Sequence, residues 1–327
     1  MSLAIFLKLF VLILIVAIGW WAGRTSMLRG PEPVRVISAV AFYLLAPALL
    51  FRATARIDAQ HMPWQTLTAF FVPVMLWLLF NYVLQRLMQK KPEGAELNSE
   101  EVAKPAVRAL SLSFGNNVQV GLPLIASLYG DTGLSIHVAI ISLHALLLMG
   151  TGTLLVELDI ARQHLDSGQQ SLAKTLQQTA RNIIIHPIIL PVLSGFAFNL
   201  LGLSLPQPLD ETLQLMGSGT VPLCLLLIGL SLAHHGIKGS VKPAIFISIG
   251  KMCLMPLAVF LTARYALHLN GVQLAVVTLG AALPCGSNTL LFAQRYQTLE
   301  AETSAAIVMS TVGFALMAPL WLMIIAQ

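Results

Sequence analysis

The sequence contains little charge. Only 10% of its 327 residues are Asp, Glu, Lys or Arg, against about a quarter in an ordinary soluble domain, while 57% are hydrophobic. So few charged residues cannot cover this much apolar side-chain surface in water. The composition therefore excludes a water-soluble fold and predicts a chain that lies in a membrane.

Cysteine is also scarce. Cys224, Cys253 and Cys285 each lie inside an apolar segment. An odd number of cysteines at such positions does not predict a disulfide framework, and their spacing is not that of metal ligands. We interpret them as packing residues and expect neither a metal site nor a cofactor.

Catalytic motifs are missing as well. The sequence has no HExxH zinc motif, no pair of aspartate-rich motifs for a prenyl diphosphate and no nucleophile elbow. The net charge of +5 does not indicate nucleic-acid binding, because most Lys and Arg residues lie between apolar segments, where membrane topology explains them. We therefore expect neither an enzyme nor a nucleic-acid partner.

What the sequence does contain is a series of long apolar segments. A helix that spans a bilayer needs about 20 mostly apolar residues. Ten segments meet this requirement: 3–23, 36–54, 64–88, 106–129, 134–157, 182–203, 216–233, 241–267, 272–294 and 305–326. The first has no small-x-small cleavage site before Arg24, so we expect a retained helix. The predicted fold class is an all-α polytopic membrane protein with ten transmembrane helices.

The basic residues predict the orientation of the chain. Fourteen of the 19 Lys and Arg residues lie in the odd-numbered connections or at the segment ends next to them, and about three lie in or next to the even-numbered ones. The positive-inside rule then places the odd-numbered connections in the cytoplasm. Both termini are predicted to face the outside of the inner (plasma) membrane.

The longest connections divide the chain. One of them, over residues 159–179, separates the first five apolar segments from the last five. We predict a first five-helix repeat over 1–157, a cytoplasmic connecting loop over 158–181 and a second five-helix repeat over 182–327. Because each half has an odd number of spans, the second half enters the membrane from the opposite side, as in inverted-repeat transporters.

A weak similarity between the halves agrees with this division. The second segment contains "FYLLAPALLF" around Pro47, and the seventh contains "TVPLCLLLIGL" around Pro222. Single prolines are common in apolar membrane helices. This similarity alone does not decide between a repeat and chance.

Two segments are predicted to be interrupted helices. The fourth reads "LSLSFGNNVQVGLPLIASLYG" and the ninth reads "LGAALPCGSNTLLFAQRYQ". Proline removes a backbone donor and glycine weakens a helix, so the freed backbone groups must face protein or a water-filled cavity. Interrupted helices at corresponding places in two halves indicate a transporter's substrate site. The residues predicted to break the helices are Gly115, Gly121, Pro123, Pro284 and Gly286.

Amide and hydroxyl side chains accompany both interruptions, and each needs hydrogen-bond partners inside a membrane. The alternative is that the glycines and prolines are ordinary kinks and packing positions, which are frequent in membrane helices. We favour a binding site. The candidate substrate-binding residues are Asn116, Asn117, Gln119, Ser287, Asn288 and Thr289, together with Lys251.

Lys251 lies about ten residues into the eighth segment, with no acidic residue at a matching depth in another segment. A buried ammonium needs a partner or loses its proton. Either the helix begins later and the lysine reaches the cytoplasmic interface, or it attracts an anion. We interpret His137 and His144 as structural histidines.

Carboxylates are absent from the two interrupted segments. A cation/proton antiporter of related inverted-repeat architecture, which is the alternative function, would need intramembrane carboxylates at this place. A sodium site is also disfavoured, although backbone carbonyls supply oxygen ligands in some transporters.

The motifs "GWWAGR", "YLLAPALLF", "GNNVQVGLPLIASLYGD" and "ALPCGSNTLLFAQRYQ" resemble the auxin efflux carrier family, which includes plant auxin carriers and bacterial malonate-carrier-like proteins. The resemblance covers nearly the whole chain, and the last two motifs are the specific ones. It implies two inverted five-helix repeats whose fourth and ninth helices are broken and cross at the transport site. It also implies a scaffold of helices one, two, six and seven, a mobile bundle made of the other helices, and a homodimer formed through the scaffold.

The resemblance assigns individual residues as well. Asn116 matches the asparagine of the plant Pro-Asn crossover, so Gly115 stands where plant members have proline. Asn288 fits the bacterial pattern of an asparagine four residues after Pro284.

The residues and the resemblance together predict a secondary carrier of a small organic anion, a mono- or dicarboxylate, that works by elevator-like alternating access. The expected partners are the small carboxylate, the lipid bilayer and a second copy of the chain. The identity of the anion, the direction of transport and any coupling to protons or sodium stay open at this point.

Overall fold

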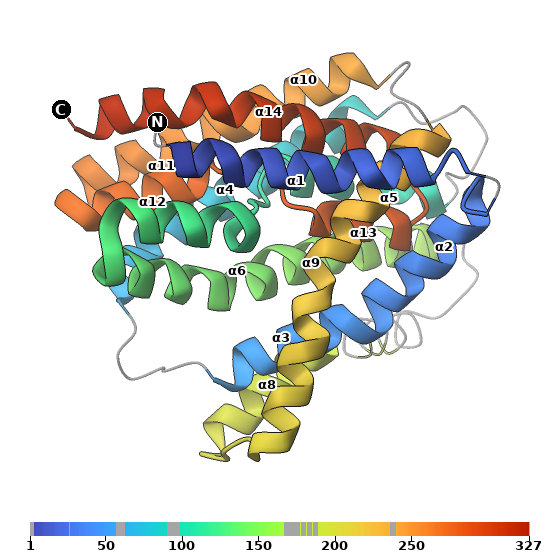
Figure 1. The fold of residues 1–327 in the computed structure, drawn as a ribbon, viewed down its shortest axis with the longest axis horizontal. Helices are drawn as coiled ribbons and strands as arrows, with labels where there is room; N and C mark the ends of the chain where they lie inside the picture. The colour runs from blue at the N-terminus through green and yellow to red at the C-terminus, as the bar shows by residue number, and fades with distance from the viewer. Residues whose placement is uncertain are drawn as a thin grey trace.

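The computed structural model describes residues 3–25, 27–56, 63–89, 99–166, 189–235 and 240–326, together with residues 177, 181 and 185. Within these residues the chain forms helices and no strand (Figure 1). The one extended pairing in this part of the chain is an isolated antiparallel bridge between Gly115 and Cys285. The prediction of an all-α chain is confirmed.

Several helical segments are long and apolar enough to cross a bilayer. Five such segments occur among the described residues: Pro31–Arg52, Trp64–Met88, Thr132–Arg162, Val241–Ala266 and Glu300–Ile325. Large apolar side chains project from them, and Leu76 and Leu316 are 62% and 72% exposed. Such surfaces suit lipid rather than water. The chain is a multi-pass membrane protein, whereas the total of ten spans and the inverted repeat stay predictions.

One set of helices packs around α9. It consists of α1 (Leu3–Ala22), α2 (Pro31–Val40), η1 (Ala41–Leu45), α3 (Ala46–Ala55), α8 (Ile189–Leu200) and α9 (Gln207–His235). Helix α1 lies against α9, and α3 lies against both α8 and α9 (Figure 1). A side chain on Gly19 would collide with the carbonyl group of Leu226, and one on Gly229 would collide with that of Val16. Glycine therefore lets α1 and α9 approach closely, and we call this set the α9 bundle.

The remaining helices pack with one another and form what we call the crossover bundle. Its members are α4 (Trp64–Met88), α5 (Ser99–Ser111), η2 (Asn117–Gly121), α6 (Leu122–Asp166), α10 (Val241–Ile249), η3 (Gly250–Leu254), α11 (Met255–Leu261), η4 (Thr262–Ala266), α12 (Gly271–Ala282), α13 (Asn288–Arg295) and α14 (Glu300–Ile325). Helix α6 turns at Gly130, which has a φ of 58°. Glycine adopts this left-handed conformation without strain. The turn lies where the predicted fourth segment ends and before the fifth begins.

Three π-helical turns precede prolines, and one of them is η2, which comes before Pro123 of α6. The η1 turn comes before Pro47, and the η3 turn comes before Pro256, each proline lying in the first turn of the α-helix that follows. Proline has no N–H group and its ring crowds the preceding turn, so the helix widens there. The η3 turn contains Lys251, so this widening determines where the lysine lies.

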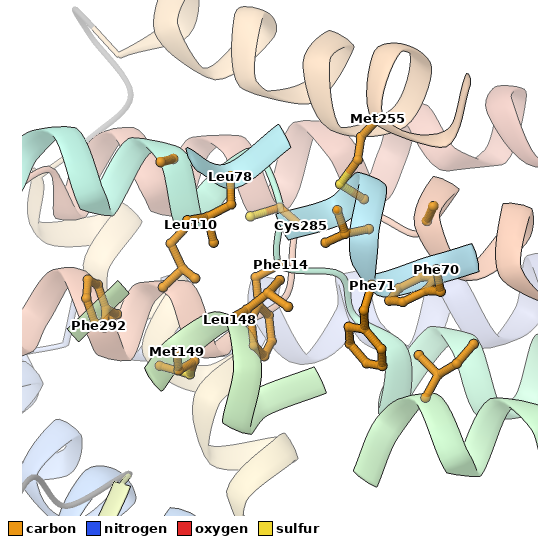
Figure 2. Close-up of a cluster of buried hydrophobic side chains, with 14 of the residues drawn as sticks. Phe70, Phe71, Leu78, Leu110, Phe114, Leu148, Met149, Met255, Cys285 and Phe292 are labelled. Carbon is orange, nitrogen blue, oxygen red and sulfur yellow. The ribbon is translucent and has the colours of Figure 1, made fainter. Parts of the chain in front are cut away.

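Buried apolar side chains surround the interrupted segments. Figure 2 shows Phe114 and Cys285, which belong to these segments, among side chains such as Phe70 of α4, Leu148 of α6 and Phe292 of α13. Phe114 and Cys285 are each at most 5% exposed. The non-helical backbone is therefore enclosed by protein, as it must be at membrane depth.

Candidate functional site

Two interrupted helices cross inside the crossover bundle. Helices α5 and α12 each end in a short extended segment, and the two segments pair antiparallel. The amide of Asn116 donates to the carbonyl of Pro284, and the amide of Gly286 donates to the carbonyl of Phe114, both at 2.9 Å. These bonds satisfy backbone groups that the helix breaks leave free. The interruptions predicted from glycine, proline and asparagine are present, and the two meet.

Glycine makes this crossing possible. A Cβ atom on Gly286 would lie 2.7 Å from the ring of Phe114 and 2.9 Å from the carbonyl oxygen of Gly115. A Cβ atom on Gly121 would collide with the imidazole of His137. That imidazole is buried, and its Nε2 lies 2.9 Å from the carbonyl oxygen of Asn117. A side chain at Gly121 or Gly286 would therefore force neighbouring groups to move.

Each helix that ends at the crossing is capped from a neighbouring helix. The indole Nε1 of Trp77 donates to the carbonyl of Leu112, just past the end of α5, at 3.0 Å. The ammonium of Lys251 donates to the carbonyls of Ala281 and Leu283, at the end of α12, at 2.6 Å and 2.8 Å. Carbonyl groups at a helix end have no partner in the helix and carry partial negative charge, so both donors stabilise these ends.

Lys251 is completely buried, with 0% exposure. It forms no ion pair with any carboxylate in the described part of the chain. Its Nζ atom lies 3.5 Å from the position that a Cβ atom on Gly115 would take. The alternative in which this lysine reaches the cytoplasmic interface is therefore wrong. A direct contact between Lys251 and a substrate stays a prediction.

A cavity of about 90 Å³ lies against the crossing, between the two bundles. Four of the predicted binding residues line it, namely Asn116, Asn117, Ser287 and Asn288. The opposite wall comes from the α9 bundle and includes Leu50 and Thr54 of α3 and Thr220 of α9. A stretch of α6 that contains His144 completes the lining. The structure thus brings residues from both interruptions to one cavity.

Two polar atoms in the wall of this cavity have no hydrogen-bond partner among the described residues. They are Oδ1 of Asn117 and Oγ1 of Thr220, and both residues are at most 4% exposed. The amide nitrogen of Asn117 donates to the carbonyl of Gly115 at 3.2 Å, so only its oxygen is free. Buried polar atoms normally have partners, and unpaired ones in a cavity indicate a place where a bound molecule supplies them.

The other predicted residues lie differently. The hydroxyl of Thr289 donates to the carbonyl of Gly286 at 2.7 Å, and this side chain does not line the cavity. The side chains of Gln119 and Pro123 lie outside the described residues, although their backbone belongs to η2 and the first turn of α6. Roles for these three residues stay predictions.

The contribution of the α9 bundle to the cavity was not predicted from the sequence. Thr220 directly follows Gly219 in the motif "GTVPLC" around Pro222, so the nearby proline was the available signal. Thr54 lies at the end of α3, and its sequence context offers no such signal. Threonine is common in membrane helices, where its hydroxyl usually bonds to the preceding turn, so neither residue stands out in the sequence.

A second, larger cavity of about 700 Å³ lies between α2 and α13. Its lining is rich in charged and titratable side chains: Glu32, Arg35, Glu100, His234, Arg295 and Glu300. Beside it the hydroxyl of Ser38 on α2 donates to the side-chain oxygen of Gln294 on α13, at 2.6 Å. This hydrogen bond links the α9 bundle to the crossover bundle.

Comparison with known proteins relates the whole chain to membrane transporters. The profile of the family described as "Membrane transport protein" matches residues 4–322. Among curated relatives, "Uncharacterized transporter YfdV" of Escherichia coli K12 is 24% identical over 317 residues, covering 95% of this chain and 94% of the relative. "Auxin efflux carrier component 8" of Arabidopsis thaliana is 26% identical over 321 residues, covering 85% of this chain and 86% of the relative.

A bacterial relative has a substrate in its name. "Putative malonate transporter" of Rhizobium meliloti is 23% identical over 280 residues, covering 86% of this chain and 83% of the relative. The match of the family profile to nearly the whole chain confirms the relationship that the crossover motifs predicted. This chain is a membrane transporter of the auxin efflux carrier family.

Proposed function

We propose that this transporter is a secondary carrier of a small organic anion, a mono- or dicarboxylate, that binds in the cavity at the crossing. One observation carries the proposal: the unpaired hydroxyl of Thr220, which can donate a hydrogen bond, and the amide ends of two helical segments face a cavity that has no acidic side chain among its described lining residues. The name of the Rhizobium relative, a putative malonate transporter, supports the same class of substrate.

The electrostatics of the cavity favour an anion. Helix α13 begins at Asn288, and η2 begins at Asn117, so the amide ends of two helical segments lie at the cavity wall. The amide end of a helix carries roughly half a positive charge. Lys251 lies behind Gly115, and in its protonated form it acts on the substrate through its electric field. An ammonium about 7 Å from a carboxylate contributes roughly 2 kcal/mol at an effective dielectric constant of about 20.

The size of the cavity favours a small acid. Its volume of about 90 Å³ is less than the roughly 150 Å³ of an engineered protein cavity that holds benzene. A carboxylate of a few carbon atoms fits this space better than an aromatic acid does. The wall formed by Leu49, Leu50 and Leu146 suits a short hydrocarbon stem between polar groups.

Transport requires the cavity to open alternately to the two sides. The substrate lies between the α9 bundle and the crossover bundle, so elevator-like movement of one bundle against the other would change its access. Such movement has to break the Ser38–Gln294 hydrogen bond. The resemblance to auxin efflux carriers supports a homodimer formed through the α9 bundle. The distribution of Lys and Arg supports location in the inner (plasma) membrane with both termini outside.

Binding and uptake measurements test this function. We expect malonate or another small carboxylate from a panel to raise the melting temperature of the purified protein and to enter proteoliposomes that contain it. Asn116→Ala and Asn288→Ala should each reduce the affinity about tenfold or more, because hydrogen bonds to charged groups are worth about 1.5–3 kcal/mol.

Thr278→Val is a suitable control, since Thr278 is buried in α12 and does not line the cavity. It should bind like the wild type. Normal uptake by both asparagine variants would place the substrate site elsewhere. The alternative, a cation/proton antiporter, predicts pH-driven cation exchange with no response to carboxylates, and it lacks a carboxylate among the described residues of the cavity wall.

A further inference from the structure

Among the buried helical threonines that the structure describes, Thr153 and Thr220 have a hydroxyl without a hydrogen-bond partner, and of these two only Thr220 lines the cavity at the crossing. The hydroxyls of Thr54, Thr278 and Thr311 each donate to the carbonyl four residues earlier in the helix, at 2.7–2.9 Å. This is how a threonine in a membrane helix usually satisfies its hydroxyl. Oγ1 of Thr220 has no such bond and no other partner in the part of the chain that the structure describes. Its residue is 1% exposed, so bulk water does not replace the missing partner.

The position of Thr220 gives this hydroxyl a possible ligand. The residue lines the cavity at the crossing and comes from α9, whereas Asn117 comes from η2 of the crossover bundle. Oδ1 of Asn117 is likewise buried without a partner among the described residues. The two bundles therefore each present one unpaired polar atom to the same cavity, a hydroxyl on Thr220 and an acceptor oxygen on Asn117.

We infer that Thr220 is a substrate-binding residue of the α9 bundle, whose hydroxyl donates a hydrogen bond to a carboxylate oxygen of the bound anion. This inference rests on the proposed function. A hydroxyl has one proton to donate, and a carboxylate oxygen is a strong acceptor. The anion thus touches both bundles at once, with the amides of the crossing on one side and Thr220 on the other.

A consequence distinguishes this role from a structural one. If Thr220 served only the packing of α9, replacing its hydroxyl would lower stability. If the hydroxyl pairs only with a bound ligand, the protein without ligand buries an unpaired polar group. Removing that group should then leave the stability of the ligand-free protein unchanged or raise it. Affinity and stability then change in opposite directions.

The test uses Thr220→Val, which keeps the shape of the side chain, and Thr220→Ser, which keeps the hydroxyl. Malonate and acetate titrations of the full-length purified protein give the affinity, and melting temperatures without ligand give the stability. We expect Thr220→Val to weaken binding about fivefold to twentyfold, as for other hydrogen bonds to charged groups. Its melting temperature should equal or exceed that of the wild type. Thr220→Ser should restore most of the affinity.

Thr54→Val is the matched comparison, because Thr54 lines the same cavity but its hydroxyl is already bonded to the carbonyls of Leu50 and Phe51. It should weaken binding less than Thr220→Val does. Wild-type affinity in Thr220→Val, or loss of affinity together with a lower melting temperature, would overturn the inference. If Asn288→Ala loses binding while Thr220→Val does not, the proposed function stands and the inference fails. If the wild type binds neither malonate nor acetate nor any other acid of the panel, both fail together.

Discussion

The two interrupted helices end in the same way but are capped by different chemistry. The end of α5 accepts a hydrogen bond from the neutral indole of Trp77, whereas the end of α12 accepts two from the ammonium of Lys251. Trp77 lies in the third predicted segment and Lys251 in the eighth, which are corresponding places in the two predicted repeats. The indole shows that a neutral donor is sufficient to cap such an end. A buried ammonium at the other end is therefore more than capping requires, in keeping with the proposal that Lys251 also attracts the anion.

The largest difference between the two interrupted helices is expected when a negative charge is added to one crossing segment and, in a separate variant, to the other. Asn117→Asp should weaken malonate binding about 100-fold, because two carboxylates about 5 Å apart repel by roughly 3 kcal/mol at an effective dielectric constant of about 20. Asn288 is less buried than Asn117, so water screens the charge in Asn288→Asp and the loss should be smaller. Titration calorimetry at pH 8 measures both. Equal losses of affinity in the two variants, or no loss in either, would show that the bound anion does not lie close to Asn117.

Exchanging the caps tests their roles directly. Lys251→Met removes a positive charge and leaves two buried carbonyls without their donor, so we expect about 30-fold weaker binding and roughly 2–4 kcal/mol lower stability. Trp77→Phe removes one neutral hydrogen bond and should lower stability by about 1 kcal/mol. Thermal unfolding and malonate titration separate the two effects.

Lys251→Arg sharpens the same test. It keeps the charge but places a planar guanidinium where a compact ammonium fits, so affinity should fall only in part. If Lys251→Met binds carboxylates as tightly as the wild type in a folded protein, the lysine is only a helix cap and the amides and helix ends recognise the anion.

The glycines of the two segments should differ in a smaller way. In Gly286→Ala the new methyl group meets the backbone oxygen of Gly115 as well as the ring of Phe114, and the backbone is held by the crossing. In Gly121→Ala it meets the side chains of His137 and Leu283, which have rotamers available. Overpacking typically costs about 1–3 kcal/mol. We expect Gly286→Ala near the upper end of this range and Gly121→Ala near the lower end, measured by thermal unfolding. The reverse order would show that the crossing backbone yields more easily than the imidazole.

Much of the architecture could be predicted from local sequence. Glycine, proline and asparagine within apolar segments act on the backbone directly, so the interruptions near Gly115 and Pro284 follow from a few residues. The same residues carry the family motifs, which is why the relationship to auxin efflux carriers was also predictable. Asn116, Asn117, Ser287 and Asn288 line the cavity because they lie at the interruptions themselves.

The partners of Lys251 and the role of Thr220 could not be predicted in this way. A search for a partner of a buried lysine looks for carboxylates, but the acceptors here are main-chain carbonyls that only the end of α12 makes available. Thr220 differs from Thr54, Thr278 and Thr311 in a hydrogen bond that its hydroxyl does not make. Both depend on the packing of segments that are distant in the sequence.

The paired backbone at the crossing has a mechanical consequence. Two hydrogen bonds join the segments around Gly115 and Cys285, and both are enclosed by apolar side chains. Pulling these segments apart would leave four buried main-chain groups without their partners, and each such bond is worth about 4–6 kcal/mol in an apolar medium. The two halves of the chain are therefore joined at the crossing by backbone hydrogen bonds. A displacement of α5 along the membrane normal would carry α12 with it as one rigid body. In the proposed elevator-like movement, sliding would take place along the surface formed by α3 and α9.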